Sequence, residues 1–228
     1  MDHVAPEPRH DDTVSAVEIV AGNVRLQGEL ALPPQPKGIV LFAHGSGSSR
    51  HSPRNTYVAR VLREEALGTL LFDLLTAAED ADYATRFDIP LLTSRLLAAT
   101  RWVAGDSRAA GLPIGYFGAS TGAAAALAAA AELGNRVGAV VSRGGRPDLA
   151  GASALRRVTA PTLLIVGGHD PTVIALNREA YALLGCVKEL EVVPGATHLF
   201  EESGTLEQVA THASNWLARW LAAGRETR

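Results

Sequence analysis

Short apolar runs recur along this chain and alternate with segments of helical periodicity. The runs lie at residues 38–43, 69–72, 137–141 and 161–166, and one more begins at Ile114 and ends at Phe117. A run without alternating polar residues is typical of a strand that is buried on both faces of a parallel sheet. Strands that alternate with helices therefore predict an α/β fold, with a mostly parallel sheet covered by helices on both faces.

An antiparallel pair is expected at the start of the chain. Residues 24–32 alternate apolar and polar side chains with period two, and residues 14–20 precede them across a short turn, which predicts a hairpin. A last strand is expected at 189–193, and helices are expected at about 55–66, 89–104, 177–184 and 205–222. We therefore expect one domain over residues 14–223, between a disordered tail at 1–13 and a second tail at 224–228.

Charge and composition exclude several classes of partner. The formal net charge of -3 gives no general attraction for nucleic acid or anionic membranes, and aromatic residues are too few for a base-stacking platform. No apolar run approaches the ~20 residues of a membrane span, and no signal-peptide segment opens the chain. The lone cysteine, Cys186, fits a reducing compartment. We expect a cytoplasmic monomer or homodimer that binds neither nucleic acid nor membrane.

The apolar run that begins at Ile114 leads into Gly118-Ala119-Ser120-Thr121-Gly122, and an alanine-rich helical segment follows to about Leu133. This strand, turn and helix form the context of a nucleophile elbow, in which a bend holds the serine hydroxyl clear of the sheet. Gly118 and Gly122 lack a Cβ, so the strand and the helix can approach closely. Ser120 is therefore the candidate nucleophile.

A serine hydroxyl needs a base, and the base needs an orienting carboxylate. His198 follows the last predicted strand, and Asp170 follows the strand before it. The carboxyl ends of parallel strands meet at one edge of the sheet, where ligands bind, so these residues can reach Ser120. His198 alone could instead cap the final helix, and Asp170 alone could be a turn or N-cap residue.

An oxyanion needs two backbone N–H donors. Thr121 follows the candidate nucleophile, and its amide is one expected donor. The loop His44-Gly45-Ser46-Gly47 follows the strand at 38–43, and its glycines let the backbone turn its amides inward. We expect Ser46 to be the second donor, with Gly47 as its neighbour; a flexible Gly/Ser loop is the alternative.

Taken together, these motifs resemble the α/β-hydrolase superfamily, specifically its small dienelactone-hydrolase-like branch. The resemblance covers roughly residues 24–222, and the order Ser120, Asp170, His198 is the one that belongs to this fold. It implies an eight-stranded sheet with a first antiparallel pair, and carboxylic ester hydrolysis through an acyl-enzyme. Similar domains also occur fused to phosphoribosyltransferase domains, and no such domain is expected within these residues.

Two departures from the family pattern narrow the expectation. Dienelactone hydrolases use a cysteine nucleophile, whereas this chain has Ser120 at that position. A general serine esterase is therefore favoured over a dienelactone hydrolase. The stretch between the strands at 137–141 and 161–166 is too short for the lid domain of lipases. We expect an open site without a separate lid.

Further residues are candidates for substrate contact. His44 and Gly47 lie in the expected oxyanion loop, and Arg143 follows the strand at 137–141. Arg143 or Arg146 could pair with a substrate carboxylate, although an internal pair with Asp148 or Asp73 is favoured. No cysteine or carboxylate stands at ligand spacing from His44 and His169, so neither a metal nor a cofactor is expected.

The sequence thus predicts a hydrolase that cleaves short- to medium-chain carboxylic esters of small molecules through an acyl-enzyme. A thioesterase or a lactone- or dienelactone-type hydrolase would use the same residues. An alternative of another class is a non-catalytic protein of this fold that binds a ligand or a partner.

Overall fold

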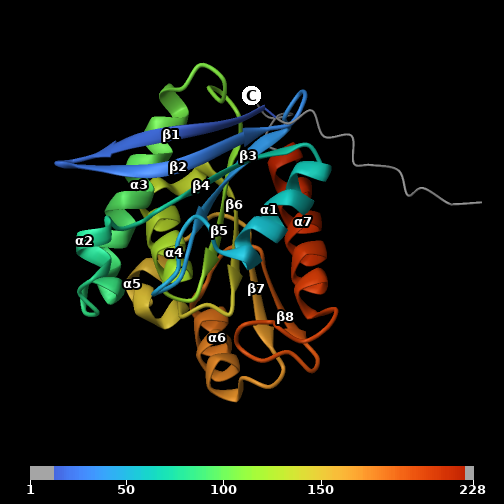
Figure 1. Cartoon of the computed structure of the whole chain (residues 1–228). Helices are drawn as coiled ribbons and strands as arrows, with labels where there is room; N and C mark the ends of the chain where they lie inside the picture. The colour runs from blue at the N-terminus through green and yellow to red at the C-terminus, as the bar shows by residue number, and fades with distance from the viewer. Residues whose placement is uncertain (1–12, 224–228) are drawn as a thin grey trace, which may run out of the picture.

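A computed structural model of the chain describes residues 13–223. The tails predicted at 1–13 and 224–228 lie outside the described residues, except for Thr13, which begins the first strand. Eight strands form one sheet with the order β1-β2-β4-β3-β5-β6-β7-β8 (Figure 1). The strands are β1 (Thr13–Ala21), β2 (Val24–Leu32), β3 (Gly38–Ala43), β4 (Leu67–Phe72), β5 (Ile114–Ala119), β6 (Val137–Arg143), β7 (Thr162–Gly167) and β8 (Lys188–Val193).

The predicted α/β architecture is confirmed. β1 and β2 are antiparallel, β2 is also antiparallel to β4, and every other neighbouring pair is parallel. The carboxyl ends of β3, β5, β6, β7 and β8 therefore lie at one edge of the sheet. This edge is where the loops that carry the candidate site residues meet.

Helices cover both faces of the sheet (Figure 1). One face carries α1 (Pro53–Glu64) and α7 (Thr205–Ala223), whose residues Val58, Leu62, Val209 and Leu217 share a core with Phe42 and Phe117. The other face carries α3 (Ile89–Gly105) and α4 (Thr121–Leu133), with Leu92, Leu96 and Leu127 in its core. The remaining helical elements are α2 (Ala77–Asp80), α5 (Ala152–Arg157), α6 (Pro171–Leu183) and the 3-10 turns η1 (Thr85–Phe87), η2 (Gly134–Arg136) and η3 (Pro147–Ala150).

The structure differs from the sequence expectation most at short helices. α6 begins at Pro171 rather than near Asn177, because Asp170 caps the helix and Pro171 occupies its first turn. α2, η1, η3 and α5 were not expected. Elements of three to six residues are too short to show a helical period, although Thr76 and Glu79 form a capping box at α2.

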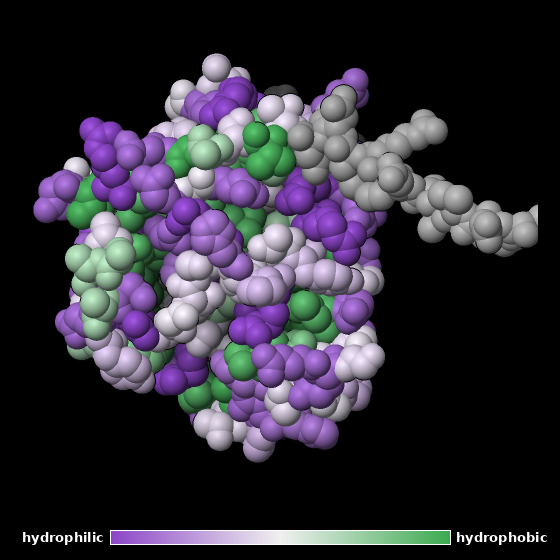
Figure 2. All heavy atoms as spheres, viewed as in Figure 1, coloured by the Kyte–Doolittle hydropathy of each residue, from purple (hydrophilic) through white to green (hydrophobic). Residues whose placement is uncertain are grey.

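The surface is mixed rather than dominated by one apolar area. On the face shown in Figure 2, hydrophilic residues are widespread and apolar residues form small separate groups. Within residues 13–223, no helix has both the length and the apolar character to span a membrane.

Candidate active site

Ser120 lies between the end of β5 and the start of α4, with φ of 51° and ψ of -120°. Residues other than glycine rarely adopt this conformation, and where they do it commonly marks a functional site. A Cβ added at Gly118 would lie 2.5 Å from Ala123 Cα, so only glycine fits under the bend. The Ser120 hydroxyl makes no capping bond to α4. The hydroxyl is therefore not used by the helix that it precedes.

A cavity of about 500 Å³ opens at Ser120. It brings together the three residues predicted to act as nucleophile, base and acid, which come from the ends of β5, β7 and β8. The lining residues are Ser120, Arg146, His169, Asp170, Thr172, Val173, Thr197 and His198.

His198 and Asp170 contact each other directly. His198 Nδ1 lies 2.7 Å from Asp170 Oδ2, while Asp170 Oδ1 accepts from the Val173 amide at 3.3 Å. The carboxylate thus caps α6 with one oxygen and holds the imidazole with the other. Asp170 is thus an N-cap residue, the alternative considered from the sequence, and it also contacts the candidate base. The N-terminal end of α6 also favours a negative charge at this position.

Ser46 and Thr121 also come together. Both line a small cavity of about 10 Å³ beside His44 and Gly45. A Cβ added at Gly45 would lie 3.0 Å from Ser120 Cβ, so this loop rests against the candidate nucleophile. Within the described part of the chain, neither the Ser46 nor the Thr121 amide donates to another protein group. Two free N–H donors therefore lie next to Ser120.

His44 has a different placement from the substrate contact expected of it. The ring is buried, its Nε2 accepts from the Leu74 amide at 3.0 Å, and its Nδ1 lies 3.0 Å from Gly45 O. Because Nε2 accepts, Nδ1 carries the proton and donates to Gly45 O. Burial lowers the pKa of His44 below its ordinary value of 6.5. A neutral His44 therefore links the Gly45–Ser46 loop to the end of β4.

This buried histidine predicts a pH dependence of stability. Between the lowered pKa of the folded chain and about pH 6.5, the unfolded chain binds a proton at His44 while the folded chain does not, so the free energy of unfolding falls as the pH is lowered through this interval. The contribution reaches about 1.4 kcal/mol per pH unit. His44→Gln keeps an acceptor and a donor without titrating, so urea unfolding of this variant between pH 5 and 7.5 should show a shallower slope. Equal slopes in the two proteins would contradict a neutral His44.

The arginines near the site divide into two cases. Arg146 forms the expected internal pair with Asp148 at 2.7 Å, and it also lines the Ser120 cavity. Arg143 pairs with neither Asp148 nor Asp73, and Asp73 instead pairs with Arg50.

The guanidinium of Arg143 is buried, with Asn55 Oδ1 at 3.5 Å and the Phe200 ring centroid at 5.9 Å. Burial, and to a lesser extent the nearby Arg54, lower the pKa of Arg143 to about 10. Arg143 does not line the Ser120 cavity, and its expected contact with substrate stays a prediction. Gly47 lies close to Arg86, since a Cβ at Gly47 would be 3.4 Å from Arg86 Nη1.

Several lining residues were not predicted as site residues. Thr172 and Val173 lie in the first turn of α6, after Pro171, and Thr197 precedes His198. The Asp-Pro pair could have predicted Thr172 and Val173 as lining residues, because a helix that begins at this pair brings its first turn to the site. Among residues 13–223, no group of three or more His, Cys, Asp and Glu side chains is arranged to hold a metal ion.

The fold and sequence are similar to those of solved structures. A crystal structure of dienelactone hydrolase from Anabaena variabilis shares 55% identity, with a TM-score of 0.89 over 92% of this chain and 99% of that one. Est1E from Butyrivibrio proteoclasticus shares 15% identity, with a TM-score of 0.78 over 91% of this chain and 99% of that one. An esterase domain from Rhodothermus marinus shares 22%, with a TM-score of 0.75 over 92% and 99%. The last two support the fold alone.

Curated proteins give a second comparison. Two from Mycobacterium tuberculosis strains, each named "putative phosphoribosyl transferase", are 58% identical over 216 residues. The match covers 95% of this chain and 48% of each relative, so the chain spans about half the length of the curated relatives it matches. No protein-family model matches the chain.

Proposed function

This chain belongs to the α/β-hydrolase superfamily, in its dienelactone-hydrolase-like branch, and on that premise we propose that it is a serine hydrolase of short- and medium-chain carboxylic esters. The observation that carries the proposal is one cavity lined by Ser120, at a strained elbow, and by His198 and Asp170, which lie 2.7 Å apart. A nucleophile, a base and an orienting acid are the groups that acyl transfer requires.

In the proposed first half-reaction, Ser120 Oγ attacks the ester carbonyl while His198 Nε2 takes the hydroxyl proton. Asp170 Oδ2 accepts from His198 Nδ1–H, which fixes the tautomer and stabilises the imidazolium that forms. The carbonyl oxygen becomes an oxyanion held by the Thr121 and Ser46 amides. The tetrahedral intermediate then collapses, the ester C–O bond breaks, and His198 returns the proton to the leaving alcohol.

In the second half-reaction, water replaces the alcohol. His198 takes a proton from the water, the resulting hydroxide attacks the acyl-enzyme carbonyl, and the same two amides hold the new oxyanion. Collapse breaks the bond to Ser120 Oγ, which recovers its proton from His198 and releases the carboxylic acid. The proposal needs no cofactor, because the chain itself supplies proton transfer and oxyanion stabilisation.

His44 has a positioning role in this proposal. It bonds both Gly45 O and the Leu74 amide, and this holds the loop that carries the Ser46 amide. A donor must be in place before charge develops if it is to stabilise the oxyanion without reorganisation. The buried, uncharged ring of His44 therefore holds in place the loop that presents the free Ser46 amide.

The preference for short and medium acyl groups rests on the β6–β7 connection. Only η3 and α5 lie in it, and both pack against α4 rather than forming a lid domain. We expect kcat/KM on p-nitrophenyl esters to be highest between two and about eight acyl carbons and to fall for longer chains, because no lid encloses a long chain. A rate that rises steadily beyond ten or so carbons would refute this preference, and no turnover on any ester would refute the hydrolase proposal.

A second candidate, a lactone hydrolase, is favoured by the name of the 55% identical relative, a dienelactone hydrolase. The same residues would open a ring ester, with the leaving alkoxide kept on the acyl group. Dihydrocoumarin assayed beside p-nitrophenyl acetate distinguishes the two: a lactone hydrolase turns over the ring ester with the higher kcat/KM. The name phosphoribosyl transferase belongs to relatives of which this chain matches 48%, and it does not enter the proposal.

A further inference from the structure

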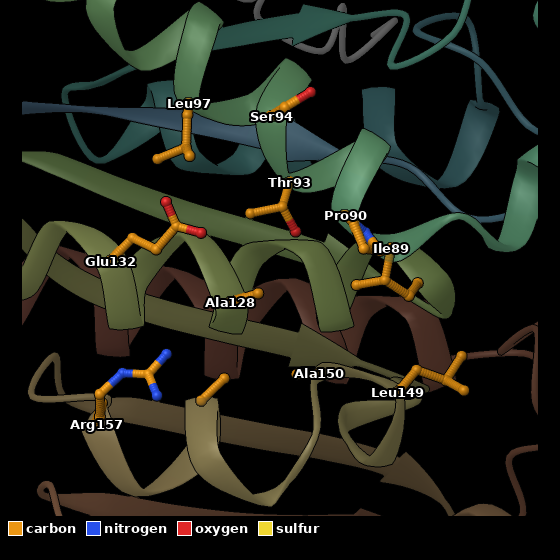
Figure 3. Close-up of a pocket in the computed structure, with 11 residues that line it drawn as sticks. Ile89, Pro90, Thr93, Ser94, Leu97, Ala128, Glu132, Leu149, Ala150 and Arg157 are labelled. Atoms are coloured by element: carbon orange, nitrogen blue, oxygen red, sulfur yellow. The ribbon is translucent and has the colours of Figure 1, made fainter.

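A second cavity, of about 400 Å³, lies among helices on the α3–α4 face of the sheet (Figure 3). None of its lining residues lines the Ser120 cavity. Its floor includes Ala128 of α4, which is seven residues beyond Thr121 and so about 10 Å further along the helix. The lining residues are Ile89, Pro90, Thr93, Ser94, Leu97, Ala128, Glu132, Leu149, Ala150, Ala154 and Arg157.

Thr93 is the unexplained group in this cavity. The residue is 4% exposed, and its hydroxyl oxygen is buried with no hydrogen-bond partner among residues 13–223. Figure 3 shows its side chain directed from α3 toward α4 and Ala128. A hydroxyl kept from water without a partner destabilises the fold, so an occupant that bonds to it would gain affinity.

Three other helical threonines of the described residues bond their hydroxyls within the helix, whereas Thr121, the first residue of α4, also has a buried hydroxyl without a partner there. The hydroxyls of Thr56, Thr100 and Thr211 each donate to the carbonyl four residues earlier, at 3.0, 2.8 and 2.9 Å. The Thr93 hydroxyl makes no such bond, although Ile89 stands four residues before it in the same helix. The Thr93 hydroxyl therefore has no acceptor among residues 13–223, and Thr93 is the member of the cavity lining in this state.

The other lining groups limit the ligand. Most of the wall is apolar, and Ala128, Ala150 and Ala154 make room by being small. Glu132 and Arg157 lie at the same end of the cavity, so their opposite charges favour neither an anion nor a cation (Figure 3). A cavity of this volume falls in the range of small-molecule sites.

We propose that this cavity binds a neutral, mostly apolar molecule of one or two rings whose carbonyl oxygen accepts a hydrogen bond from Thr93. The site is independent of the proposed hydrolysis, since neither Ser120 nor His198 takes part. No covalent step is involved.

Two probes of matched shape test the proposal: 1-tetralone, which has a carbonyl, and tetralin, which lacks one. Isothermal titration of the full chain should show that 1-tetralone binds about two- to ten-fold more tightly than tetralin, the factor for one neutral hydrogen bond. Thr93→Val keeps the shape and removes the donor, so the preference for 1-tetralone should be lost or reversed, because its carbonyl would then be buried without a partner. Ala128→Leu places a larger side chain in the cavity, and leucine is a good helix former, so α4 should be kept. The affinity for both probes should fall at least about ten-fold.

Three outcomes would overturn the proposal. One is no measurable binding of 1-tetralone up to its solubility limit by a protein whose circular dichroism shows it folded. The second is a preference for 1-tetralone that persists in Thr93→Val. The third is an unchanged affinity in Ala128→Leu, which would place the probe elsewhere, such as the Ser120 cavity.

Discussion

Replacing Ser120 by alanine is expected to lower kcat for p-nitrophenyl acetate by about 10⁴-fold or more, because the covalent route is lost. The proposed chemistry forms a covalent acyl-enzyme on Ser120 Oγ, and the other hydroxyl of the elbow, that of Thr121, is buried. Alanine keeps a Cβ at the same backbone position, where φ is 51°, so the strain of the bend is unchanged. The loss should therefore appear in kcat with little change in stability.

Covalent labelling by a fluorophosphonate checks the same residue without a substrate. Wild-type protein should be labelled once and lose its esterase activity in proportion, and Ser120→Ala should not be labelled. Ser142→Ala is a matched control, because Ser142 lies on the neighbouring strand β6 and its buried hydroxyl has no hydrogen-bond partner. This control should keep both labelling and turnover.

The same measurement separates an enzyme from a binding protein of this fold. A binding protein does not need an activated serine, so it would show neither labelling nor turnover above background. Labelling that persists in Ser120→Ala would also contradict the assignment, because another residue would then be the nucleophile.

Replacing Gly122 by alanine is expected to lower the free energy of unfolding by about 3 kcal/mol, the upper end of the usual cost of overpacking. A Cβ at this position would lie 2.1 Å from Ala43 O and 2.4 Å from His44 O. Both neighbours are backbone atoms at the end of β3, so no side-chain rotation relieves the contact. Urea unfolding followed by circular dichroism measures the change.

Gly105→Ala provides the control for this variant. Gly105 is the last residue of the helix α3, and a Cβ there has no atom within 4 Å. Alanine has the higher helix propensity, so this variant should be unchanged or stabilised by up to about 1 kcal/mol. An equal effect of the two substitutions would show that helix propensity, rather than the contact with β3, decides the result at Gly122.

The sequence was sufficient for features that depend on a local residue pattern or on the order of residues along the chain. Continuous apolar runs identified the parallel strands, because a strand that is buried on both faces carries apolar side chains on both. The glycines around Ser120 predicted a close strand-to-helix approach, and the contacts at Gly118 and Gly122 agree with it. The order of Ser120, Asp170 and His198 predicted that one edge of the sheet would bring them together, and they line one cavity.

It was less successful where a residue's partner is distant in the chain. Arg143 and Asp73 were considered partners, yet Asp73 bonds Arg50, which lies 23 residues away, and Arg143 lies against Asn55 and Phe200. His44 was a candidate for substrate contact, and its ring is instead bonded between Gly45 and Leu74. The partner of each of these side chains depends on which loops come into contact in the fold. A local pattern of residue types does not predict that contact.

The fold class, the elbow and the residues proposed to carry acyl transfer could be predicted from the sequence alone. These follow from hydrophobic periodicity, from the absence of a Cβ at glycine and from the chemistry of a serine, a histidine and an aspartate. The tertiary structure was needed to show which oxygen of Asp170 contacts His198, that Arg143 is buried with no carboxylate partner among residues 13–223, and that Thr93 lines a cavity. The physical reason is that burial and hydrogen-bond partnership depend on how separate elements pack, and packing brings together residues that are far apart in the chain.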